Sequence, residues 1–260
     1  MKSLIVANWK CNPTTLKEAK GLFDSVKKAL LRQRLRTGEG IKNIKNVEVV
    51  LCPPFIYLSS FKFQVSSFKL GAQNCFWEEK GAYTGEISPL MIKNLGIEYV
   101  IVGHSERRKY FRETDEEINK KIKKALSVGL KIILCVGETT EEKEQGKKQQ
   151  VLIAQIEKAL DRIPRDEMKN ISVAYEPVWA IGTGNNCSTD ETMKSIISIR
   201  QIITRLYNRE TADKVRIIYG GSVNGENSGS YLKESLANGL LVGGASLKPE
   251  EFIKIVRSAT

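Results

Sequence analysis

Eight short apolar runs, separated by stretches with helical spacing, constrain the fold of this chain more than any other feature. The runs are rich in β-branched residues and nearly continuous in apolar character, as expected of strands covered on both faces. Strands that alternate with helices pair in parallel, so this order predicts an α/β fold. The runs lie at Leu4–Val6, Val47–Leu51, Lys69–Ala72, Tyr99–Val102, Lys131–Val136, Ile171–Ala174, Val215–Tyr219 and Leu240–Val242.

Helix signals lie between these runs. Apolar residues recur at helical spacing from Leu16 to Leu30 and from Ile118 to Leu126. Thr114 and Ser188 each precede a glutamate by three residues, which matches the capping box that begins a helix. Pro249 suits the first turn of a last helix.

The number of strands favours a closed barrel. Eight strands close a (β/α)8 barrel, and 260 residues is an ordinary length for one. An open doubly wound sheet is the alternative, but no linker or break in composition divides the chain. We therefore predict a single-domain (β/α)8 barrel over residues 1–260. Residues 35–45, with two glycines and mixed charge, are expected to form a surface loop.

Composition narrows the class of protein. Hydrophobic residues make up 41% and charged residues 27%, which is typical of a soluble globular chain. No apolar run reaches about 18 residues, and the start of the chain lacks a secretory signal, so no membrane partner is expected. Five scattered cysteines and one histidine favour neither a disulfide framework nor a zinc site. We expect a reduced, cytoplasmic protein without a metal.

The chain is basic, with 41 Lys and Arg against 30 Asp and Glu, a formal net charge of +11. Such an excess is compatible with nucleic acid, a membrane surface or a small anion as partner. Much of it lies in runs such as 120–124, on expected helix faces and without the interleaved aromatic residues of a base-stacking surface. We therefore interpret these runs as solvated faces and expect no nucleic-acid partner.

In a barrel of this kind the active site lies where the strands end. Glu176, after the sixth run, is a candidate general base. His104, after the fourth run, precedes an expected helix whose dipole favours the neutral imidazole, which can still donate a hydrogen bond. Lys10 shares a strand face with Asn8 and is a candidate cation for an oxyanion. Each would be unremarkable alone, and their common position favours catalysis.

Glycine pairs follow the last two runs, at 220–221 and 243–244. They fit either tight turns or a phosphate site in which backbone N–H groups approach an anion. Residues 182–187 nearly match a dinucleotide-binding motif but end in cysteine, so no nucleotide cofactor is predicted. A base, a neutral electrophile, an ammonium group and a phosphate site suit proton abstraction beside the carbonyl of a small phosphorylated sugar.

Five motifs, in order along the chain, resemble the triosephosphate isomerase family. The resemblance implies a TIM barrel that interconverts dihydroxyacetone phosphate and D-glyceraldehyde 3-phosphate through an enediolate, in glycolysis and gluconeogenesis, without cofactor or metal. That family is itself the standard example of a glutamate base paired with a neutral histidine. The motifs are Ala7–Asn12, Gly103–Arg108, Ala174–Gly184, Tyr219–Val223 and Leu241–Leu247.

The resemblance also implies roles for single residues. Glu176 would move the proton between the two substrate carbons, and His104 would move protons between the oxygens. Lys10 and Asn8 would stabilise the negative charge, and Glu106 would support Lys10. The residues implied to bind substrate are Asn8, Lys10, Gly182, Ser222, Gly243 and Gly244.

The resemblance further implies a lid over residues 177–187, which excludes water from the enediolate. Two positions depart from the family pattern. Asn185-Asn186-Cys187 stands where a sequence like Lys-Thr-Ala is usual, so lid closure is expected to differ. Asn238 stands where an aspartate is usual, which puts a local contact in doubt.

A homodimer is also expected from the resemblance. Residues 74–88 are too long for a βα loop of about 2–6 residues, and we expect them to reach a second subunit. Thr84 and Glu86 would then lie near the partner subunit's Lys10, with Cys11 at the contact. Thiol modification of Cys11 would inactivate by splitting the dimer.

Two other functions stay open at this point. A different TIM-barrel enzyme acting on another sugar phosphate would share the phosphate loops but need other groups on strands one, four and six. A basic, non-enzymatic scaffold that binds nucleic acid would lack Lys10, His104 and Glu176, yet all three are present.

Overall fold

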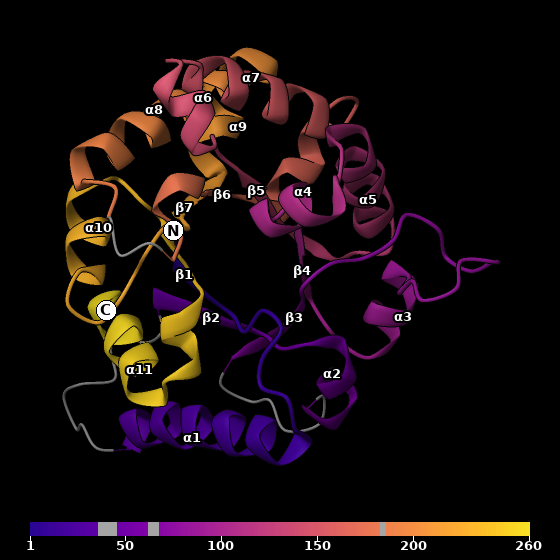
Figure 1. Cartoon of the computed structure of the whole chain (residues 1–260), viewed down its shortest axis with the longest axis vertical. Coiled ribbons are helices and arrows are strands. Elements are labelled where there is room, and N and C mark those ends of the chain that lie inside the picture. The colour runs from indigo at the N-terminus through magenta and orange to yellow at the C-terminus, as the bar shows by residue number, and fades with distance from the viewer. Residues whose placement is uncertain (36–45, 62–67, 183–185) are drawn as a thin grey trace.

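The structure is a computed structural model that describes residues 1–35, 46–61, 68–182 and 186–260. Eight parallel strands pair in chain order and close into one barrel, with β1 paired to both β2 and β8 (Figure 1). The predicted (β/α)8 barrel is confirmed. The strands are β1 Ser3–Asn8, β2 Val47–Cys52, β3 Lys69–Ala72, β4 Tyr99–Val102, β5 Lys131–Val136, β6 Ile171–Tyr175, β7 Arg216–Tyr219 and β8 Gly239–Val242.

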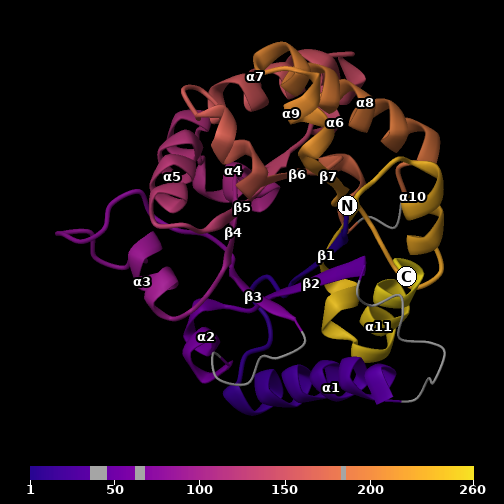
Figure 2. The same cartoon turned by 180° about the vertical axis from the view of Figure 1, so that it is seen from behind.

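Helices surround the barrel on all sides, as both views show (Figures 1 and 2). Short 3₁₀ turns precede β6 and follow β6 and β8: η3 Arg165–Asn170, η4 Val178–Ala180 and η5 Gly244–Leu247. The predicted loop at 35–45 lies, beyond its first residue, outside the described residues. The α-helices are α1 Leu16–Leu35, α2 Phe55–Phe61, α3 Pro89–Asn94, α4 Ser105–Phe111, α5 Asp115–Ser127, α6 Thr140–Glu144, α7 Lys148–Ala159, α8 Thr189–Leu206, α9 Arg209–Lys214, α10 Ser228–Glu234 and α11 Pro249–Ser258.

Alternate residues of every strand except β3 pack into two separate apolar layers. Ile5 and Ala7 of β1 face the helices and join the larger core, whereas Leu4 and Val6 face the barrel interior. The interior is filled by side chains from β1, β2, β4, β5, β6, β7 and β8, including Ile101. Because both faces are buried, the strands read as nearly continuous apolar runs.

Strand ends differ slightly from the sequence prediction. Three strands have the predicted bounds, but β1 continues to Asn8 and β6 to Tyr175, because barrel pairing extends to Asn8 opposite Cys52 and to Tyr175 opposite Tyr219. Asn8 therefore ends its strand rather than following it. The positive φ of 53° at Lys10 then turns the chain away from the strand direction.

Of the two predicted capping boxes, the one at Thr114 is complete, and the one at Ser188 has the bond from the serine side chain. The Thr114 side chain accepts from Glu117 N–H, and the Glu117 carboxylate accepts from Thr114 N–H, which completes the capping box. Ser188 accepts from Glu191 N–H at the start of α8. Pro249 occupies the first turn of α11 as predicted.

Asn238, which stands where an aspartate was expected, accepts two hydrogen bonds. Its Oδ1 accepts from Ile217 N–H at 3.0 Å and from the Arg200 guanidinium at 3.1 Å. Burial lowers the pKa of Arg200, which remains a cation at neutral pH. The amide oxygen is thus a neutral acceptor for both groups, and the Asn238 N–H donates to Ile217 O at 2.8 Å, so the start of β8 is bonded to β7. In the part of the chain that the structure describes, no helix combines the length and apolarity needed to cross a bilayer.

Candidate active site

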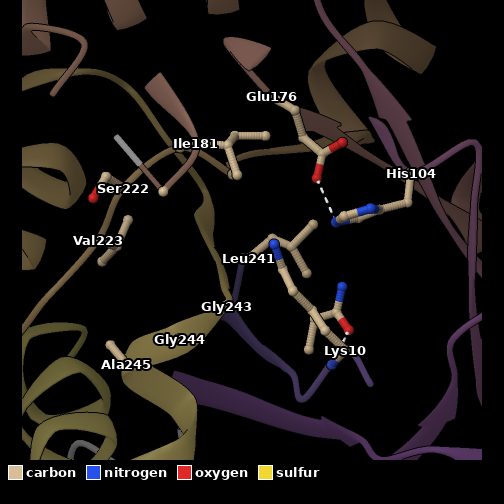
Figure 3. A pocket seen from close by; sticks show the side chains of 14 residues that line it. Lys10, His104, Glu176, Ile181, Ser222, Val223, Leu241, Gly243, Gly244 and Ala245 are labelled. Carbon is tan, nitrogen blue, oxygen red and sulfur yellow. Dashed lines mark hydrogen bonds and ion pairs between the residues drawn. The ribbon is translucent and has the colours of Figure 1, made fainter. Parts of the chain in front are cut away.

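A cavity of about 190 Å³ opens where the strands end, and it is lined by residues from five strand ends (Figure 3). All the sequence-predicted site residues except Glu106 line it. Glu106 is not part of the lining, but its carboxylate accepts a hydrogen bond from Lys10 Nζ. The lining residues are Asn8, Lys10, His104, Glu176, Ile181, Gly182, Gly220, Gly221, Ser222, Val223, Leu241, Gly243, Gly244 and Ala245.

Glu176 and His104 face each other inside this cavity, as the dashed line in Figure 3 shows. Glu176 follows β6 directly and is 2% exposed. Its Oε1 lies 3.1 Å from His104 Nε2, and its Oε2 accepts from Ser105 N–H at 2.9 Å. Ser105 begins α4, so one carboxylate oxygen sits at a helix N-terminus, where negative charge is favoured.

The surroundings of His104 define its tautomer. His104 is the N-cap of α4, and its Nδ1 accepts a hydrogen bond from Glu106 N–H at 3.2 Å. A nitrogen that accepts carries no proton, so the neutral ring holds its proton on Nε2 and directs it at Glu176.

Lys10 is held from three directions. Its Nζ pairs with Glu106 Oε1 at 2.6 Å, its backbone N–H donates to Asn8 Oδ1 at 3.0 Å, and its carbonyl accepts from Gln73 Nε2 at 2.8 Å. The same Gln73 amide donates to Cys52 O. These bonds hold a residue with left-handed backbone, a strained conformation that is concentrated at functional sites.

Glycine-rich turns form the opposite side of the cavity. A Cβ at Gly220 would lie 3.0 Å from Glu176 Cγ, so any larger residue would crowd the carboxylate. Gly244 begins η5, and the first N–H groups of a helix have no partner within it. With Ser222 and Gly243 alongside, these groups form a polar, positively polarised wall suited to an anion.

Sequence reasoning missed Glu138, which is fully buried and follows β5 after one residue. Its carboxylate accepts from Trp179 Nε1 at 2.8 Å and from Tyr175 Oη at 3.0 Å. Lys143 Nζ lies 3.2 Å from the centre of the Trp179 ring. Glu138 thus fastens the first turn after Glu176. The strand-end rule, applied to the fifth run, would have found it.

Below the cavity, burial raises the pKa of the Cys135 thiol, and the charge of Glu176 raises it further. This thiol is therefore neutral beside the carboxylate. Within the residues that the structure describes, no three His, Cys, Asp or Glu side chains are grouped to hold a metal ion.

A closed parallel barrel whose strand ends bring a buried carboxylate, an imidazole, an ammonium group and glycine-rich turns to one cavity has the arrangement of a barrel enzyme for small phosphorylated substrates. The family model for triosephosphate isomerase matches residues 3–259. Proteins named triosephosphate isomerase from Dictyoglomus thermophilum and from a Thermoanaerobacter species are 45% and 48% identical, each alignment covering at least 98% of both chains. The chain belongs to the triosephosphate isomerase family.

Proposed function

We propose that this chain interconverts dihydroxyacetone phosphate and D-glyceraldehyde 3-phosphate by proton transfer through an enediolate, a step of glycolysis and gluconeogenesis. The observation that carries the proposal is the contact of 3.1 Å between the Glu176 carboxylate and His104 Nε2, inside a cavity with an anion-binding wall. The family to which the chain belongs supports the same reaction.

Glu176 acts as the base. Its carboxylate removes a proton from the carbon next to the carbonyl, and the electron pair moves onto the carbonyl oxygen to give the enediolate. The same carboxyl then returns the proton to the neighbouring carbon. The substrate enters between Glu176 and His104, so the hydrogen bond from Nε2 passes from the carboxylate to a substrate oxygen.

His104 and Lys10 stabilise the charge on the oxygens. The Nε2 proton of His104 is donated to the developing oxyanion, and the ring then exchanges protons between the two oxygens. Lys10 supplies a fixed positive charge, held by Glu106 at 2.6 Å, and Asn8 holds the Lys10 backbone. Backbone groups of Gly182, Ser222, Gly243 and Gly244 bind the phosphoryl group.

Residues 177–187 form the lid in this proposal. Trp179 at its start is bonded to Glu138, and Cys187 at its end is buried. Residues 183–185 of the expected lid, which include Asn185, lie outside the described residues. When closed, the lid excludes water and prevents the enediolate from expelling phosphate.

Purified protein is expected to convert each triose phosphate into the other and to exchange the substrate's carbon-bound hydrogen with deuterium from solvent. Exchange follows because Glu176 removes and returns a proton that equilibrates with water. A coupled assay measures turnover, and proton NMR in D₂O measures exchange. Larger phosphorylated sugars serve as the comparison. If the protein converts these but neither triose phosphate, the site belongs to a different sugar-phosphate enzyme.

The proposal includes a cytoplasmic homodimer. Residues 79–86 are exposed, and the segment between β3 and α3 projects from the barrel in both views (Figures 1 and 2). Large exposed apolar side chains lie on this segment and on α2, α3 and α4, and a contact with a second copy would cover them. They are Ile56, Tyr83, Leu90, Met91, Tyr110 and Phe111.

A thiol reagent is expected to inactivate the enzyme by modifying Cys11 and separating the subunits. Cys11 is exposed in the single chain, whereas the other four cysteines are buried. A bulky adduct at a dimer contact prevents close packing, so the dimer dissociates. The sedimentation coefficient and the isomerase activity, followed in parallel, should decrease together. The Cys11→Ser variant should resist both changes, and equal inactivation of this variant would refute the assignment.

A further inference from the structure

The far end of the proposed lid is attached to α10 through Tyr231. The Tyr231 hydroxyl donates to the carbonyl of Cys187, and both residues are buried. Ser188 then caps α8. The backbone carbonyl at this end of the proposed lid is thus bonded to Tyr231 one residue before the helix cap.

The same tyrosine supports the phosphate loop from the other side. Its ring stacks on the Tyr219 ring, with centroids 4.1 Å apart and an interplanar angle of 22°. Tyr219 is the last residue of β7, and the Gly220–Ser222 turn folds back over it. A Cβ on Gly221 would overlap the Tyr219 hydroxyl, so the turn packs directly against the phenol.

We propose that Tyr231 is a positioning residue for the isomerase reaction, which joins the end of the lid at Cys187 to the phosphate loop at Gly221. This inference rests on the proposed function. One contact is polar and fixes the lid end, and the other is a ring stack that supports the loop. Because both go through a single rigid side chain, the lid end and the phosphate loop keep a fixed relative position.

The two contacts have separable consequences. Without the hydroxyl, the lid end loses its anchor, and ordering it over the substrate costs more conformational entropy. The exposed enediolate then breaks its carbon–oxygen bond to the phosphoryl group more often. The electron pair of the oxyanion re-forms the carbonyl, the double bond shifts to the neighbouring carbon, and phosphate leaves with the electrons of the broken bond. The remaining enol takes a proton on carbon and loses its hydroxyl proton to give methylglyoxal. Without the ring, the Gly220–Ser222 turn also loses support.

The test uses Tyr231→Phe, which keeps the ring, and Tyr231→Leu, which removes the stack as well. In Tyr231→Phe, the share of turnovers that release inorganic phosphate should rise about three- to tenfold, the range that corresponds to one lost neutral hydrogen bond. Its affinity for phosphoglycolate, whose carboxylate carries charge like that of the enediolate, should fall by a similar factor. Tyr231→Leu should in addition bind inorganic phosphate more weakly.

Tyr207→Phe is the matched control. The Tyr207 hydroxyl donates to the carbonyls of Leu160 and Ile163, at the opposite end of α8 from the lid. This variant should lower the melting temperature without raising phosphate release. If Tyr231→Phe, like this control, does not raise phosphate release, then Tyr231 has only a structural role and the proposal fails. Unchanged phosphate affinity in a folded Tyr231→Leu would refute the connection to the loop. Absent isomerase activity in the unaltered protein would instead refute the proposed function.

Discussion

Replacing Glu176 with glutamine is expected to lower kcat by at least about 100-fold, the typical contribution of a positioned general base. An amide has nearly the shape of the carboxylate but cannot take a proton from carbon. Its oxygen can still accept from Ser105 N–H, the contact that is 2.9 Å long in the structure. The fold and the cavity should therefore persist while the chemistry stops.

Two measurements separate this loss from a structural effect. Solvent deuterium exchange into the substrate should slow by the same factor as turnover, because both need the proton transfer. The melting temperature of Glu176→Gln should stay close to that of the unaltered protein. As a matched control, Glu141→Gln changes an exposed carboxylate on α6 and should leave kcat unchanged. Turnover of Glu176→Gln within a few-fold of normal would show that another group is the base.

The sequence predicted the barrel because its signal is repeated eight times. Each strand, buried on both faces, stands out as an apolar run, and runs such as 69–72 and 131–136 have the bounds seen in the structure. The ends of β1 and β6 were less clear, because polar Asn8 and amphipathic Tyr175 continue the strands only through pairing with neighbours. That pairing is set by barrel closure, which leaves no local mark.

The site was predictable as a set of positions but not as a set of contacts. Parallel strands bring their ends to one side of the barrel, so the positions of His104 and Glu176 at strand ends predict that they are neighbours. Their contact, and the role of Nδ1 as an acceptor, depend on how α4 begins. Gln73 donates to the Lys10 carbonyl, and Glu138 accepts from the Trp179 indole, so both hold residues beside the site. No sequence motif encodes these contacts.

His104→Gln is expected to lower kcat by about 100- to 1,000-fold, the typical cost of losing one oxyanion donor. Glutamine can present an N–H near the place of Nε2, but it cannot give up that proton and receive another, so transfer between the substrate oxygens is lost. Lys10, held by Glu106, should keep substrate binding nearly intact, so KM should change far less than kcat.

The contact between His104 and Glu176 makes the pair of substitutions more informative than either alone. Groups that act as a unit have non-additive effects, because removing one leaves the other without its function. The double variant His104→Gln with Glu176→Gln should therefore lose much less activity than the product of the two single losses. Full multiplicative losses in coupled-assay kcat would mean that the two side chains act independently, and the contact of 3.1 Å would then have no part in the reaction.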